Sequence, residues 1–282
     1  MQGFLRQCLR SKLWTLGLWM VVPALATLPA WDGASYAQAE PSGEVAEASD
    51  DAPAKVDPKA VKIAEATLEA MGGRQAWENT RYLRFEFFGF RLHHWDRYTG
   101  QHRLEGKTRD GNSYVVLHNI QTREGQAWLD GEPLAGEDLE QWLERAYGAW
   151  INDAYWLIMP YKLQDPGVAL YYEGEETLDG KVYDKLLLKF NRVGLTPGDR
   201  YWAWINRETG LMDRWGYHLQ GWEADREITQ WKWLDWERHG QILLAPRRVQ
   251  VGDDREAMLG KLAVFDSLPE TVFTAPEAVV LD

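Results

Sequence analysis

Apolar positions first recur with a helical period shortly after residue 57. Asp57 and Pro58 supply a capping residue and a proline at the first helical position, which is typical of a helix start. The apolar positions that follow share one face: Val61, Ala64, Leu68 and Met71. Gly72 and Gly73 end the period. We therefore predict a short amphipathic helix, with the RQAWENT stretch as a candidate further turn.

From Arg81 onward the period changes to two, which is the spacing of strands with one buried face. The polar stretches YTGQ, RDGN, TREG and LDGE separate these runs and are typical of hairpins, so we expect about five antiparallel strands. A helical period returns over residues 138–157, where Asp138 and Gln141 resemble a capping box and Pro160 stops the helix. Its apolar positions are Leu139, Trp142, Leu143, Ala146, Tyr147, Trp150, Ala154 and Leu157.

Strand patterns resume after YKLQDPG and bring the predicted total to about 11–12 strands. No linker follows residue 57, so we expect one domain over residues 58–282. Its predicted class is α+β: a large curved antiparallel sheet with an N-terminal helix and an inserted helix on its concave side. Residues 40–57 are acidic and lack aromatic side chains, which predicts a flexible leader.

The stretch DRYWAWINRETGLMDRWGY, residues 199–217, is apolar on both faces of its predicted hairpin. The turn length gives the opposite pairs Asn206 with Leu211, Trp202 with Trp215, and Trp204 with Asp213. The three tryptophans would then share a face. Two arrangements would cover both faces: a helix packed on the concave side, or a cavity whose guest supplies the missing contacts.

The first residues carry the pattern of a secretory signal. Arg6, Arg10 and Lys12 precede a largely apolar run, and Ala37-Gln38-Ala39 forms a small-x-small cleavage site. We predict a signal peptide over residues 1–39, cleaved after Ala39, and a location in the periplasm, with secretion as the second choice. An uncleaved membrane anchor is the competing interpretation. The chain's one cysteine, Cys8, leaves with the signal.

The chain has 282 residues and a formal net charge of −12. This acidity argues against nucleic acid or an anionic membrane as a partner, because phosphate binding depends on Lys and Arg. No later stretch is long and apolar enough to cross a bilayer, so we expect no transmembrane segment after signal removal. Glycine-rich phosphate loops are missing from the sequence, and we predict no cofactor.

Residues for catalysis are few. Ser113 and Ser267 are the serines after residue 57, and neither lies in Gly-x-Ser-x-Gly. In HHWD, His94 and Asp96 can share a strand face, and a third metal ligand would come from a neighbouring strand, as His102 or His118. A metal-dependent or other hydrolase is therefore one alternative function. A carbohydrate-binding or assembly module with exposed tryptophans is another. We assign no catalytic residue and no metal ligand.

Several phrases follow one another in a characteristic order over residues 58–268: DRYTGQHRLEGKTRDGNSYVV, GQAWLDGEPL, LDGKVYDKLLLKF and RETGLMDRW. In this order they resemble the periplasmic lipoprotein-sorting superfamily with the LolA/LolB-like fold, in a branch of secreted bacterial proteins. The resemblance implies a half-open β-barrel whose apolar interior is partly plugged by helices and receives lipid or lipid-modified chains without catalysis. The loop NRVGLTPGD and the lack of a lipid-attachment cysteine depart from that pattern.

The predicted function is a non-catalytic periplasmic carrier for an amphiphilic or lipid ligand, with a membrane-associated protein as a partner. We expect residues 150–162 to act as a lid, and Lys162 and Arg200 to meet an anionic headgroup. The prediction depends on a concave side that the inserted helix does not fill. The candidate cavity residues are Trp150, Trp156, Tyr161, Lys162, Arg200, Trp202, Trp204 and Trp215.

Overall fold

The first helix begins where its cap pattern predicts. The computed structural model describes residues 57–190, 196–253 and 255–281. In α1 (Pro58–Ala70), the Asp57 carboxylate accepts a hydrogen bond from the backbone N–H of Lys59 at 2.8 Å, and Pro58 is the first helical residue. RQAWEN forms α2 (Arg74–Asn79), which confirms the further turn. The predicted signal peptide and residues 40–56 of the leader lie outside the described residues.

Strands account for most of the remaining chain, and the α+β class is confirmed. The described strands outnumber the 11–12 expected, because several have only two to four residues. Their bounds are β1 (Tyr82–Phe87), β2 (Arg91–Asp96), β3 (Gln101–Lys107), β4 (Ser113–Asn119), β5 (Gly125–Leu129), β6 (Glu132–Pro133), β7 (Val168–Leu178), β8 (Lys181–Phe190), β9 (Arg200–Asn206), β10 (Met212–His218), β11 (Thr229–Leu234), β12 (Glu237–His239), β13 (Ile242–Leu244), β14 (Arg247–Gln250) and β15 (Glu256–Phe265).

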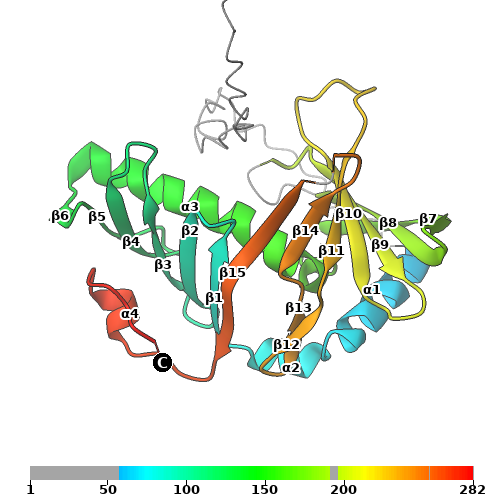
Figure 1. Ribbon diagram of the computed structural model, residues 1–282, viewed down its shortest axis with the longest axis horizontal. Coiled ribbons are helices and arrows are strands. Elements are labelled where there is room, and N and C mark those ends of the chain that lie inside the picture. Colours follow the sequence, from blue (N-terminus) through cyan, green and yellow to red (C-terminus); the bar gives the residue numbers. More distant parts are fainter. Residues whose placement is uncertain (1–56, 191–195, 254, 282) are drawn as a thin grey trace, which may run out of the picture. The chain divides into compact units, whose positions relative to one another are not determined.

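Thirteen of these strands form one antiparallel sheet in the order β6-β5-β4-β3-β2-β1-β15-β14-β11-β10-β9-β8-β7. The last long strand, β15, pairs with β1 and joins the two halves of the sheet (Figure 1). β6 and β7 stand at opposite ends of this order, so the sheet does not close into a barrel. β12 and β13 form a separate two-stranded sheet.

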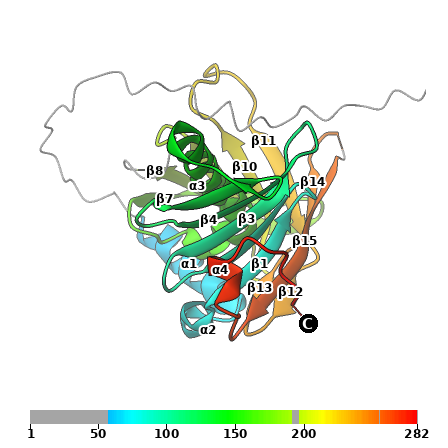
Figure 2. The ribbon, with the colours of Figure 1, turned by 90° about the vertical axis from the view of Figure 1, so that its left-hand side faces the viewer.

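The inserted helix α3 (Gly136–Ile158) runs along one face of the sheet, which we call the inner face (Figures 1 and 2). It begins at Gly136, and Ala135 makes no side-chain capping bond, so the capping box predicted at Asp138 and Gln141 is wrong. Asp138 lies in the first turn instead, where a carboxylate stabilises the free N–H groups of a helix start. Beyond α3, the chain continues through Pro160 as the 3₁₀ helix η2 (Met159–Lys162).

The main core lies between the inner face, α1 and the end of α3. A smaller core lies under the first half of α3, which covers it only partly. There, buried strand residues meet half-buried helix residues: Leu104, Tyr114, Val116 and Ala127 on the sheet, with Leu139, Trp142 and Leu143 on α3. Among the described helices, none is both long and apolar enough to cross a membrane.

The opposite, outer face of β1–β3 is covered by the C-terminal segment, which contains α4 (Thr271–Thr274) (Figure 2). The Arg103 guanidinium is fully buried beneath this segment and donates hydrogen bonds to four backbone carbonyls. These belong to Val272, Ala275, Pro276 and Glu277. Arg103 thus holds this segment through its backbone carbonyls, and we call the segment the C-terminal strap.

Candidate functional site

The tryptophan-rich hairpin of β9 and β10 does not have the predicted register. Asn206 and Leu211 flank the turn as expected, and the N–H of Asn206 donates to the carbonyl of Leu211 at 2.8 Å. A bulge between Met212 and Arg214 then shifts the pairing, so Trp215 lies opposite Ala203. Because one extra residue moves every later side chain to the other face, Trp215 points to the inner face. The prediction that Trp202, Trp204 and Trp215 share a face is wrong.

Trp202 and Trp204 pack on the outer face of the sheet, away from α3. The Trp202 Nε1–H donates to Glu173 at 3.0 Å, and the Trp204 Nε1–H donates to Glu176 at 2.8 Å. Lys185 lies beside both carboxylates, at 3.5 Å and 4.0 Å. These contacts account for the second apolar face of the hairpin without a guest molecule.

Trp215 belongs to a group of aromatic side chains on the inner face, where α3 crosses β8–β11. We call this group the inner aromatic cluster: Tyr155, Trp156, Phe190, Tyr201, Trp215, Tyr217 and Trp231. The rings of Trp215 and Tyr201 stack with centroids 5.4 Å apart, and the Trp156 ring meets Trp215 edge-on at 4.9 Å. Tyr155 contacts Phe190 and Tyr201 at 6.2 Å and 5.4 Å.

One side of the inner aromatic cluster is buried and the other is partly exposed. Trp156 and Trp215 are buried, whereas Tyr155, Phe190 and Tyr201 keep part of their surface accessible. The hydroxyl of Tyr155 and the Nε1–H of Trp215 are buried and have no hydrogen-bond partner within the described residues. Burial raises the pKa of the Tyr155 phenol, and Asp165 and Asp199 raise it further. The cluster therefore offers unpartnered polar donors on its buried side, and Arg255 lies 5.5 Å over its Trp231 ring.

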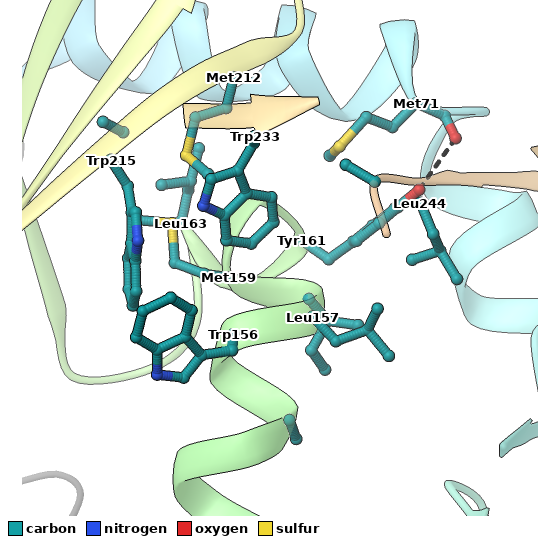
Figure 3. Close-up of a cluster of buried hydrophobic side chains, with 14 of the residues drawn as sticks. Met71, Trp156, Leu157, Met159, Tyr161, Leu163, Met212, Trp215, Trp233 and Leu244 are labelled. Carbon is teal, nitrogen blue, oxygen red and sulfur yellow. Dashed lines mark hydrogen bonds between the residues drawn. The ribbon is translucent and has the colours of Figure 1, made fainter. Parts of the chain in front are cut away.

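The predicted lid, residues 150–162, includes some of the most deeply packed residues of the core. Trp156, Leu157 and Met159 lie between Trp215, Trp233 and Leu244, and Leu163 follows in the same cluster (Figure 3). The hydroxyl of Tyr161 contacts the carbonyls of Met71 and Leu243 at 3.0 Å and 2.7 Å. The end of α3 thus fills this part of the inner face and serves as an anchor.

Trp150 lies earlier on α3 and is only partly buried. Its ring meets that of Trp95 edge-on at 5.3 Å, and the ring of Tyr147 lies 5.8 Å away. The two predicted headgroup cations are engaged elsewhere. Lys162 forms an ion pair with Asp165. Arg200 lies over the Trp202 ring at 5.7 Å, on the outer side, so the structure does not bring it to the inner aromatic cluster.

Arg248 fixes the C-terminal end of α3. Its guanidinium is fully buried, stacks on the Trp233 ring at 3.5 Å, and donates to the carbonyl of Trp156 at 2.5 Å and to that of Ala245 at 2.7 Å. The last carbonyls of a helix lack intrahelical partners and attract positive charge. Burial lowers the pKa of Arg248. The sequence pattern gave no indication of this residue.

A buried group of polar side chains lies between the C-terminal part of α3 and the inner face of β2–β4. Asp153 of α3 binds Arg91 through two hydrogen bonds of 2.6 Å and 2.8 Å and contacts Nε2 of His93 at 2.9 Å. His93 contacts His102, and His102 contacts His118. These histidines meet only because three strands pair in the correct register, so the sequence alone did not associate them.

The hydrolase alternative required His102 or His118 beside His94 and Asp96. The register contradicts it: Trp95 pairs with His102, so His102 faces inward, whereas His94 pairs with Arg103 on the outer face. Asp96 accepts two hydrogen bonds from Arg81, at 3.1 Å and 2.8 Å, and another from the Tyr98 N–H. All thirteen tryptophans between residues 57 and 281 are buried or half-buried, which disfavours a flat carbohydrate platform.

No family model and no curated protein matches the chain. Solved structures similar to it include a DUF1329 family protein from Desulfovibrio piger, with 12% identity over 77% of this chain and 99% of that chain, and a TM-score of 0.41. A putative outer membrane lipoprotein-sorting protein domain from Vibrio parahaemolyticus has 10% identity over 76% and 96%, with a TM-score of 0.40.

A LolA superfamily protein from Nitrosomonas europaea has 12% identity over 74% of this chain and 96% of that chain, with a TM-score of 0.32. The lipoprotein-sorting superfamily that the sequence resembles is thus represented among the similar structures. At these identities and TM-scores, function has to be argued from the chain's own side chains.

Proposed function

We propose that this chain is a non-catalytic binding protein of the periplasm that holds a lipid or lipid-modified chain between α3 and the inner face of β8–β11. The observation that carries the proposal is the partly exposed aromatic surface of Tyr155, Phe190 and Tyr201, which continues into buried Trp215. Wide rings with few rotatable bonds suit acyl chains, and unpartnered donors suit an ester or amide oxygen.

Ligand binding would require α3 to move, because its end fills part of the inner face. The buried segment around Trp156 and Met159 is the fixed end, held also by Arg248. The first half of α3 is only half-buried over its smaller core and is the part that swings. We therefore assign the moving part to the residues of α3 up to Asp153, which overlaps only the start of the lid expected from the sequence.

The energy available is sufficient for useful affinity. Burying an acyl chain contributes about 0.8 kcal/mol per CH₂, so a chain of about twelve carbons gives about 10 kcal/mol before the costs of association. With an association cost of about 4 kcal/mol, about 6 kcal/mol is left, which is an affinity on the order of tens of micromolar. A membrane-associated protein that delivers or accepts the ligand is part of the same proposal, since a chain this acidic has little electrostatic attraction to an anionic membrane.

The proposal is tested with a dansyl-labelled undecanoic acid titrated into the purified protein. We expect Phe190→Ala to weaken binding at least fivefold, because its ring forms part of the accessible aromatic surface. Phe265→Ala is the matched control, since Phe265 is also partly buried but pairs with Tyr82 in the other half of the sheet. Equal affinities of the two folded variants would count against this site.

Native mass spectrometry of protein isolated from its own host provides an independent measurement. A co-purifying lipid or acylated peptide would identify the ligand class directly. Protein that carries no such mass, and that also fails to bind the labelled fatty acid, would contradict the proposed function.

A further inference from the structure

Three histidines and one carboxylate form a continuous buried row between the sheet and α3. Nε2 of His93 lies 2.9 Å from Asp153 Oδ2, Nδ1 of His93 lies 3.0 Å from Nε2 of His102, and Nδ1 of His102 lies 2.7 Å from Nε2 of His118. All four side chains are at most 2% exposed. We call these residues the histidine row. No part of the proposed binding site uses them.

The carboxylate determines the tautomer of each ring. Burial opposes ionisation of Asp153, but Arg91 and the bond to His93 hold its pKa below the ordinary value, so it only accepts hydrogen bonds. His93 must then carry its proton on Nε2 and accept at Nδ1 from Nε2–H of His102. By the same logic, His102 accepts from Nε2–H of His118. The lone pair on Nδ1 of His118 is left buried, with no partner within the described residues.

The row attaches α3 to the sheet through Asp153, just ahead of the buried end of the helix. Asp153 is the carboxylate of α3 that is completely buried, and it accepts from Arg91, His93 and Asn152. Around it, α3 meets this half of the sheet mainly through half-buried apolar side chains. The bonds of Asp153 to Arg91 and His93 therefore act as a polar clasp.

We propose that the histidine row is a proton-sensitive latch that releases the first part of α3 from β2–β4 under acid conditions. In the closed state the three imidazoles are neutral and Asp153 is ionised. When the first part of α3 lifts and water reaches the row, His118 binds a proton from solvent at Nδ1 and becomes an imidazolium, while Asp153 stays ionised. The positive charge on this ring opposes its return to the buried position, so the open state persists in acid.

The surroundings of the row favour this direction of response. Burial lowers the pKa values of His93 and His102, and it lowers that of His118 to about 4. Opening of α3 admits water, in which an imidazole binds protons more readily, so acid favours the open state. The charged and titratable groups that face the row are Arg91 and Tyr114 from the strands, Arg123 with its partner Glu144 beside His118, and His94 through the sheet.

Hydrogen exchange of α3 amides between pH 7.5 and pH 5 tests the latch, after correction for the intrinsic pH dependence of exchange. We expect residues 140–153 to lose at least tenfold in protection, while β8–β11 keep theirs. Asp153→Asn should give the low protection already at pH 7.5. His118→Phe should move the midpoint to lower pH. His94→Phe is the matched control, because His94 is equally buried but lies on the outer face.

Two results would overturn the latch: protection of α3 that persists until the whole protein unfolds, or equal midpoint shifts in the two phenylalanine variants. Nitrogen-15 NMR of the wild-type imidazoles decides the matter if a variant does not fold. All three rings must carry Nε2–H at pH 7.5, and a ring of the row with Nδ1–H at this pH contradicts the argument.

A role of the latch in ligand release rests on the proposed function, whereas the latch itself does not. Release of the dansyl-labelled fatty acid at pH 5 would connect the two. If no fatty acid binds at any pH but α3 exchange and the tautomers behave as stated, the proposed function fails and the latch stands. If exchange is unchanged, the latch fails whatever the binding result.

Discussion

Replacing Trp215 by alanine tests whether the end of α3 and the inner face form a packed core. Trp215 is 2% exposed and contacts Tyr201, Trp156 and Trp233, with ring centroids 5.4, 4.9 and 5.9 Å away. Truncation of a buried tryptophan costs about 3–5 kcal/mol. Its Nε1–H has no partner within the described residues, so no hydrogen bond is lost. Removing this unsatisfied donor offsets about 1 kcal/mol or more of the truncation cost, so we expect a loss at the lower end of the range of about 3–5 kcal/mol.

Urea unfolding followed by far-ultraviolet circular dichroism measures this loss without depending on tryptophan fluorescence. The variant should also bind free indole in the vacated space. Indole at ten times its dissociation constant should restore about 1.4 kcal/mol. Trp222→Ala is the control, because Trp222 is partly exposed and rests on Arg226 at 3.8 Å. We expect it to cost less than about 1 kcal/mol.

A loss in Trp215→Ala no greater than that in Trp222→Ala would refute the reasoning. It would mean that the inner aromatic cluster is loosely packed or wet in solution and that the end of α3 does not anchor the helix. The first half of α3 would then no longer be the preferred moving part.

Acid should destabilise the protein through its buried neutral histidines. Burial lowers the pKa of His94 to about 3 and that of His118 to about 4, so the unfolded chain, with ordinary values near 6.5, binds more protons below that pH. The free energy of unfolding is therefore highest above pH 6.5 and falls as the pH drops toward 4, by on the order of 2 kcal/mol per histidine at pH 5. The difference between the urea midpoints at pH 7.5 and pH 5 should therefore be smaller in His94→Phe than in the wild type. Arg103→Gln should free the C-terminal strap, because charge-assisted bonds to four carbonyls contribute about 1.5–3 kcal/mol each before ordering costs. Limited proteolysis after residue 268 should become faster in this variant but not in Arg84→Gln, and equal cleavage in both would contradict the role of Arg103.

The periodicities of the sequence were sufficient to predict the helices and the antiparallel sheet, because each depends on local spacing. Pro58 and Pro160 mark helix boundaries through their own backbone constraints, and α1 and α3 follow the helical period. The face of Trp215 could not be predicted in the same way. It depends on one bulged residue near Asp213, and side-chain packing on both sides of the sheet determines where a bulge forms.

The candidate site was less predictable because its groups come from distant segments. The histidine row requires the pairing of β2, β3 and β4 together with the position of Asp153 on a helix 35 or more residues later. His93 and His94 are neighbours in the chain and point to opposite faces of the sheet. Which of them joins the histidine row depends on which face α3 covers. Arg248 likewise contacts the carbonyl of Trp156 at the end of α3, although the two residues are 92 positions apart in the sequence.

The two attachments of α3 differ in strength, and this difference determines how the helix should open. At its end, Trp156, Leu157, Ile158 and Met159 are all buried, and each contributes about 1.5–3 kcal/mol. Together they stabilise the packing of that end by on the order of 6–12 kcal/mol. The clasp at Asp153 is a single buried ion pair, and breaking such a pair costs about 3–5 kcal/mol. The clasp therefore opens first, and α3 should swing about its C-terminal end, which lifts the residues up to Asp153 from the first half of the sheet without dismantling the core around Trp156 and Trp215.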